Sequence, residues 1–146
     1  MLRRIVLIAT ASAAALAAAV PAAGASPLPL PLPLLSAPAG DQLTVTVSET
    51  ARTDGRYELL CGPTGGDHPA AQEACDRLDE LALQGEDPFA PVPQDQMCTE
   101  QMGGPETAHI TGTWQGRQVD ATFSRTNGCE ISRWQTMEPV LPNTRS

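Results

Sequence analysis

The chain has 146 residues, a formal net charge of −8 at pH 7, and 17 acidic side chains against nine basic ones. This composition excludes nucleic acid and anionic membrane surfaces as partners, because few cations are available to neutralise phosphate. Aromatic residues make up only 3% of the sequence. A thin core is therefore expected, and the four cysteines are available to supplement it with disulfides.

The first 25 residues are typical of a secretory signal peptide. Arg3 and Arg4 precede an apolar run at residues 5–20, and a small-x-small cleavage pattern ends at Ala25. An uncleaved membrane anchor is disfavoured, because a spanning helix needs about 20 apolar residues and no stop-transfer charges follow. We expect a secreted protein that begins at Ser26 and has a net charge of about −10 once both arginines are removed.

A proline-rich segment separates the signal peptide from the rest of the chain. Proline alternates with leucine over residues 27–34. Because proline lacks the backbone N–H that helices and central strands use, residues 26–41 are predicted to form a flexible, extended arm with polyproline character. A folded domain is expected over residues 42–146.

Alternating apolar and polar residues predict the first two strands of this domain. Leucine and valine alternate with threonine and serine over residues 43–48, which indicates a half-buried strand. A second strand is expected at residues 56–61, after a turn at Asp54-Gly55. Its odd-numbered positions share one side: Tyr57, Leu59 and Cys61.

A helix is predicted after a glycine- and proline-rich stretch. Glycine and proline exclude regular structure over residues 62–69. Pro69 suits the first turn of a helix, and Asp67 or His68 precedes it as a capping residue. Apolar residues then recur at steps of three and four until a stop near Gly85. These residues are Ala71, Ala74, Cys75, Leu78, Leu81 and Ala82.

The second half of the domain is predicted to contain a loop and a hairpin. Three prolines in residues 86–96 indicate a loop that leads to Cys98. Residues 107–114 alternate like a strand, and a tight turn at Gln115-Gly116 connects them to a returning strand. The apolar positions of the returning strand are Val119, Ala121 and Phe123. The pattern weakens past residue 131.

The four cysteines allow three disulfide connectivities. Cys61 ends a strand and Cys75 lies on the apolar face of the next helix, so their pairing joins helix to sheet. That pairing leaves Cys98 with Cys129 and ties the loop to the far end of the hairpin. Each disulfide would contribute roughly 3–4 kcal/mol on the chain-entropy account. A zinc site is disfavoured because no Cys-x-x-Cys occurs, so no metal or cofactor is expected.

Catalytic patterns are not found in the sequence. It contains no Gly-x-Ser-x-Gly, no His-Glu-x-x-His and no phosphate-binding glycine loop. His68 and His109 belong to different predicted elements, and each has an ordinary structural interpretation, as a turn residue and as a solvated strand residue. We therefore predict that the protein is not an enzyme and has no catalytic residue.

Four sequence blocks occur in order between residues 43 and 131. They are Leu-Leu-Cys61-Gly-Pro-Thr-Gly-Gly-Asp-His68-Pro69-Ala-Ala with Cys75, Met97-Cys98-Thr99-Glu100-Gln101, Gly112-Thr-Trp-Gln-Gly-Arg-Gln-Val119, and Phe123-Ser-Arg-Thr-Asn-Gly-Cys129-Glu130. With this cysteine spacing, the blocks resemble the Streptomyces subtilisin inhibitor family. The resemblance implies an α+β fold with an antiparallel sheet of about five strands, two helices packed on one face, and the disulfides Cys61–Cys75 and Cys98–Cys129.

The resemblance also implies a function and a site. Family members are usually homodimers that inhibit secreted serine endopeptidases of the subtilisin and trypsin classes. Carried over by position, the reactive bond joins Glu100 to Gln101, within a reactive loop that includes Cys98, Thr99 and Met102. Such a loop binds the protease like a substrate, and Glu100 would be the residue that determines specificity. A disulfide at Cys98, two residues before Glu100, lowers the free-energy cost of ordering the loop on binding.

The sequence departs from the family pattern in three places. Glu100 stands where methionine, lysine or arginine is common, so we expect a preference for proteases with a cationic primary pocket. Gly103-Gly104 adds one residue and is predicted to loosen the loop after the reactive bond. Residues 137–146 lack the family's apolar final strand. The alternative function is a non-inhibitory secreted binding module that retains the inhibitor scaffold.

Overall fold

The computed structural model describes residues 40–144. The predicted signal peptide and residues 26–39 of the proline-rich arm lie outside the described residues. Asp41, which we assigned to the arm, already belongs to the first strand. Within the described range, neither helix is long and apolar enough to cross a membrane.

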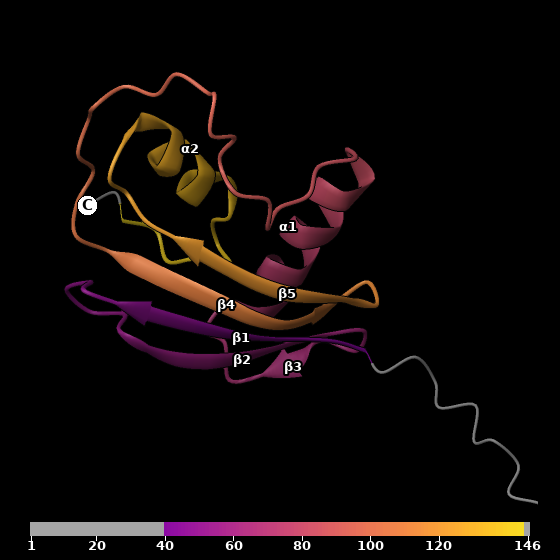
Figure 1. The fold of residues 1–146 in the computed structure, drawn as a ribbon. Helices are drawn as coiled ribbons and strands as arrows, with labels where there is room; N and C mark the ends of the chain where they lie inside the picture. Colours follow the sequence, from indigo (N-terminus) through magenta and orange to yellow (C-terminus); the bar gives the residue numbers. More distant parts are fainter. Residues whose placement is uncertain (1–39, 145–146) are drawn as a thin grey trace, which may run out of the picture. The chain divides into compact units, whose positions relative to one another are not determined.

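A five-stranded antiparallel sheet forms the base of the described domain (Figure 1). Its strands are β1 (Asp41–Ser48), β2 (Gly55–Cys61), β3 (Gly65–Gly66), β4 (Thr107–Trp114) and β5 (Arg117–Phe123), in the spatial order β3-β2-β1-β4-β5. Four of these strands were predicted within one or two residues. The expectation that residues 62–69 lack regular structure is wrong, because Gly65 and Gly66 pair with Leu60 and Leu59 at the sheet edge.

One face of the sheet carries the core and the other is polar. In β1, Leu43, Val45 and Val47 are buried, whereas the threonines between them lie on the opposite face. The antiparallel register continues this division across the sheet, since Val45 is opposite Tyr57 on one side and Ile110 on the other. The buried sheet residues also include Leu59, Cys61, Ala108, Trp114, Val119, Ala121 and Phe123.

Two helices in the described part of the chain cover the apolar face (Figure 1). Helix α1 (Ala71–Leu83) packs against β2 and β3, and helix α2 (Gly128–Thr136) packs against β5. The predicted capping of α1 by Asp67 or His68 is wrong, because Ala70 is the N-cap and no side chain caps this helix. Asn127 is the N-cap of α2, and its side chain accepts a hydrogen bond from the Glu130 N–H at 2.9 Å.

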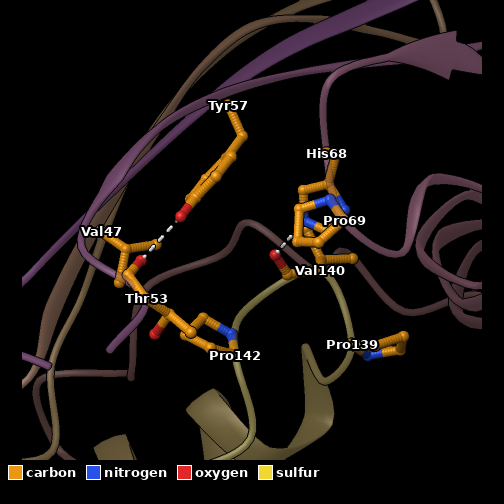
Figure 2. A pocket seen from close by; sticks show the side chains of 8 residues that line it. All are labelled: Val47, Thr53, Tyr57, His68, Pro69, Pro139, Val140 and Pro142. Carbon is orange, nitrogen blue, oxygen red and sulfur yellow. Dashed lines mark hydrogen bonds between the residues drawn. The ribbon is translucent and has the colours of Figure 1, made fainter. Parts of the chain in front are cut away.

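The residues that follow α2 complete the core without forming a strand. Met137, Val140 and Leu141 are fully buried. His68 lies against this segment, and Figure 2 shows its imidazole directed at the carbonyl oxygen of Val140, at 2.9 Å. Because the Ala70 N–H donates to His68 Nδ1, the proton of the neutral ring is on Nε2, which donates to Val140.

Candidate reactive loop

The segment from the end of α1 to the start of β4 contains no helix or strand and passes around α2 (Figure 1). Both predicted disulfides are confirmed, with Cys61–Cys75 joining β2 to α1 and Cys98–Cys129 joining this segment to the first turn of α2. The Cα atoms of Cys98 and Cys129 are 5.3 Å apart. The second disulfide therefore fixes the loop two residues before Glu100.

A backbone hydrogen bond fixes the next residue of the loop. The Gly128 N–H donates to the Thr99 carbonyl oxygen at 2.9 Å. The two residues are so close that a Cβ on Gly128 would collide with the Thr99 hydroxyl. Consecutive residues of α2, Gly128 and Cys129, thus hold consecutive residues of the loop, Thr99 and Cys98.

The loop is fixed again three residues after Glu100. The Gly103 N–H donates to the Arg125 carbonyl oxygen at 2.7 Å. A Cβ on Gly103 would lie 2.7 Å from Cγ1 of Ile131 and 3.1 Å from Cβ of Arg125, so only glycine allows this approach. Gly103 is therefore held against the scaffold, contrary to the predicted loosening at this residue, whereas the loosening expected at Gly104 stays a prediction.

The predicted reactive residues lie between these two attachments. Glu100 and Gln101 are exposed, and Met102 is 72% exposed. Within the described residues, the side chains of Glu100 and Gln101 form no hydrogen bond or ion pair. Met97, on the other side of the disulfide, is 97% exposed. A short, solvent-directed peptide segment therefore lies between two backbone attachments to the scaffold.

The two histidines lie apart from this loop and from each other. His68 is buried against Val140, whereas His109 is exposed on β4, with its Nε2 2.7 Å from a carboxylate oxygen of Asp120 on β5. Within residues 40–144, neither histidine forms a hydrogen bond with a serine or cysteine side chain. Among residues 40–144, no group of His, Cys, Asp and Glu side chains is arranged to hold a metal ion.

Sequence reasoning did not identify the residues that support the loop. The Asn127-Gly128 pair before Cys129 is a recognisable helix start, and it could have suggested Gly128 as a support. Arg125 contributes a backbone carbonyl, which every residue has, and Ile131 contributes apolar contact. No sequence pattern distinguishes these two roles.

Comparisons with known proteins show the family of this chain. The family model described as subtilisin inhibitor-like matches residues 37–127. Subtilisin inhibitor-like protein 1 of Streptomyces cacaoi is 34% identical over 106 residues, which cover 68% of this chain and 92% of that protein. The subtilisin inhibitor of Streptomyces albogriseolus is 33% identical over 102 residues, which cover 67% of this chain and 69% of that protein.

A solved structure is also similar. It is Streptomyces caespitosus sermetstatin in complex with Bacillus licheniformis subtilisin, which is 25% identical with a TM-score of 0.45 and covers 70% of this chain and 98% of that chain. The sequence relatives above are named as inhibitors and not as enzymes. Because the family model spans more than half of the chain and these relatives exceed 30% identity, the chain belongs to the subtilisin inhibitor-like family of protease inhibitors.

Proposed function

We propose that the protein is a secreted, substrate-like serine protease inhibitor whose reactive bond joins Glu100 to Gln101. The observation that supports this function best is the exposed segment between the backbone attachments at Thr99 and Gly103. A segment held in this way can pair its backbone with the edge of a protease cleft. Because both ends are already ordered, binding costs less conformational entropy than it would for a free peptide.

The same attachments explain inhibition in place of rapid turnover. The protease serine attacks the carbonyl carbon of Glu100, a covalent acyl bond forms, and the bond to the Gln101 nitrogen breaks as that nitrogen gains a proton. The new amine is separated from the Gly103 attachment only by Met102. A tethered amine has a high effective concentration at the acyl carbon, so the peptide bond reforms faster than the fragment leaves.

Glu100 determines which proteases this loop fits. An apolar primary pocket would remove water from the carboxylate at a cost of several kcal/mol, without a compensating charge. A cationic pocket pairs with the same group. We therefore assign as partner a secreted serine endopeptidase that cleaves after acidic residues.

The test is a panel of a glutamate-specific serine endopeptidase, subtilisin, chymotrypsin and trypsin, each mixed with the protein at equimolar ratio. Wild type should inhibit the glutamate-specific enzyme, and Glu100→Lys should transfer inhibition to trypsin. Glu100→Gln is the matched control that keeps the side-chain shape and removes the charge. Tight inhibition of subtilisin by wild type would contradict the specificity. If neither wild type nor Glu100→Lys inhibits any protease, the protein is a non-inhibitory binding module.

Two further expectations belong to this proposal. The mature protein is secreted after cleavage near Ala25, which mass spectrometry of the N-terminus in culture medium would test. The protein also forms a homodimer. In the described domain, neither helix covers the polar face of the sheet, so this face can serve as the dimer interface. Light scattering coupled to size-exclusion chromatography measures the oligomeric mass directly, and a monomer would exclude the dimer.

A further inference from the structure

Arg125 contacts both ends of the glycine-rich segment that follows the reactive bond. Its carbonyl oxygen accepts the Gly103 N–H at 2.7 Å, and its guanidinium Nη1 lies 3.1 Å from Oε2 of Glu106. We propose that Arg125 is a positioning residue that braces residues 103–106 and so keeps the Gln101 amine at the acyl carbon. This inference rests on the proposed inhibitory function.

The ion pair is shielded enough from water to contribute to the brace. The side chains of Arg125 and Glu106 are only 11% and 18% exposed. Exposed ion pairs contribute little, but removing one partner of a shielded pair leaves the other charge desolvated and uncompensated. Glu106 immediately precedes β4, so the pair fixes the segment where it enters the sheet.

The segment between the two contacts needs such a brace. Gly104 has a φ of 145°, a region that is open to glycine and disfavoured for other residues. A glycine retains more backbone freedom than other residues when its neighbours are not held. Arg125 restricts this freedom because one residue holds both the start and the end of the segment.

The two sides of the reactive bond are held in different ways. On the Glu100 side, the Cys98–Cys129 disulfide provides a covalent link to α2. Among the described residues, no disulfide holds the Gln101 side, because all four cysteines are paired elsewhere. The Arg125 contacts therefore attach the Gln101 side to the scaffold without a covalent bond, whereas the disulfide attaches the Glu100 side covalently.

Arg125→Met tests the brace, because it removes the guanidinium and keeps both the backbone carbonyl and an apolar side chain. When this variant is in complex with a glutamate-specific endopeptidase, we expect Glu100–Gln101 to be hydrolysed about tenfold faster than in wild type. This is the effect of losing one charge-assisted hydrogen bond. Mass spectrometry measures the rate. Hydrogen exchange at the Gly103 amide should also be faster than in wild type. Arg125→Lys, which keeps a positive charge, should return both the hydrolysis rate and the exchange rate most of the way to wild type.

Arg133→Met is the matched control. Arg133 is 12% exposed and pairs with Glu130, and its guanidinium donates to the carbonyl oxygens of Ala90 and Thr122, outside residues 98–106. Its loss should lower the free energy of unfolding and leave both readouts unchanged. If Arg125→Met does not fold, Glu106→Gln removes the same charge pair with a smaller change in shape.

Three outcomes would overturn the brace. The first is hydrolysis of Glu100–Gln101 in Arg125→Met at the wild-type rate. The second is hydrolysis that is accelerated as much in Arg133→Met as in Arg125→Met. The third is hydrogen exchange at the Gly103 amide that is unchanged in Arg125→Met. The exchange measurement needs no protease, so it separates this inference from the proposed function. Absence of inhibition by wild type contradicts the proposed function, whereas an unchanged Gly103 amide contradicts only the role of Arg125.

Discussion

Removing each disulfide in turn separates stability from inhibition. Cys98–Cys129 spans 31 residues of sequence and Cys61–Cys75 spans 14. On the chain-entropy account, loops of these lengths correspond to about 3.7 and about 3.0 kcal/mol of folding free energy. Replacing both cysteines of a pair with alanine should therefore destabilise the protein by similar amounts in the two variants.

The two variants should differ sharply in inhibition. Without Cys98–Cys129, the Glu100 side of the reactive bond is held to α2 mainly by the Thr99–Gly128 hydrogen bond. One backbone hydrogen bond contributes about 1 kcal/mol net, much less than the disulfide. The loop then becomes a cleaved substrate. Cys61–Cys75 joins β2 to α1, away from the loop, so its removal should leave inhibition intact wherever the protein is folded.

The assay combines urea unfolding with the lifetime of the protease complex. Trp114 and Trp134 are buried, so their fluorescence reports unfolding of each variant. Complex lifetime is then measured against a glutamate-specific endopeptidase under conditions where both variants are at least nine-tenths folded. A wild-type lifetime for the folded variant without Cys98–Cys129 would refute the reasoning. Loss of inhibition in the folded variant without Cys61–Cys75 would refute it equally.

Three further predictions follow from single contacts. Gly128→Ala should shorten the lifetime of the protease complex, because the new Cβ displaces Thr99. Adding Thr99→Ala removes the hydroxyl that the Cβ meets and should restore the lifetime. An unchanged lifetime in Gly128→Ala would contradict the contact. Leu141→Ala should lower the free energy of unfolding, measured by urea titration, by about 2–5 kcal/mol, because Leu141 is fully buried. A loss well below about 1 kcal/mol would mean that the C-terminal segment is not part of the core. The Asp54 carboxylate accepts hydrogen bonds from the Thr50 side chain, which has the largest effect, and from the Thr50 backbone N–H, and these lower the pKa of Asp54 below its ordinary value of 3.8. The ionised Asp54 therefore stabilises the fold above pH 3.8, and this stabilisation is lost as the pH falls through the lowered pKa. Asp54→Asn should flatten the acid limb of a plot of stability against pH, and an unchanged limb would contradict the assignment.

Several features of the fold could be predicted because they depend on local patterns. Side chains alternate across a strand, so the apolar positions of β1, β2, β4 and β5 identified both the strands and their buried face. The cysteine pairing followed from the expected ends of those elements. The short strand β3 was missed because its two glycines carry no side-chain pattern, and it forms only through pairing with β2.

The sequence by itself determined four of the five strands of the described domain, the helix α1, the cysteine pairing and the loop that leads to Cys98. These depend on periodicity, on turn residues and on cysteine spacing, which are written along the chain. Only the tertiary structure decided that Gly103 is held tightly, that Arg125 contacts both ends of the segment after the bond, and that the C-terminal residues complete the core. The reason is that these contacts join residues that are distant along the chain. Their free energies depend on burial and on shape at the point of contact, and neither is encoded in the local sequence pattern.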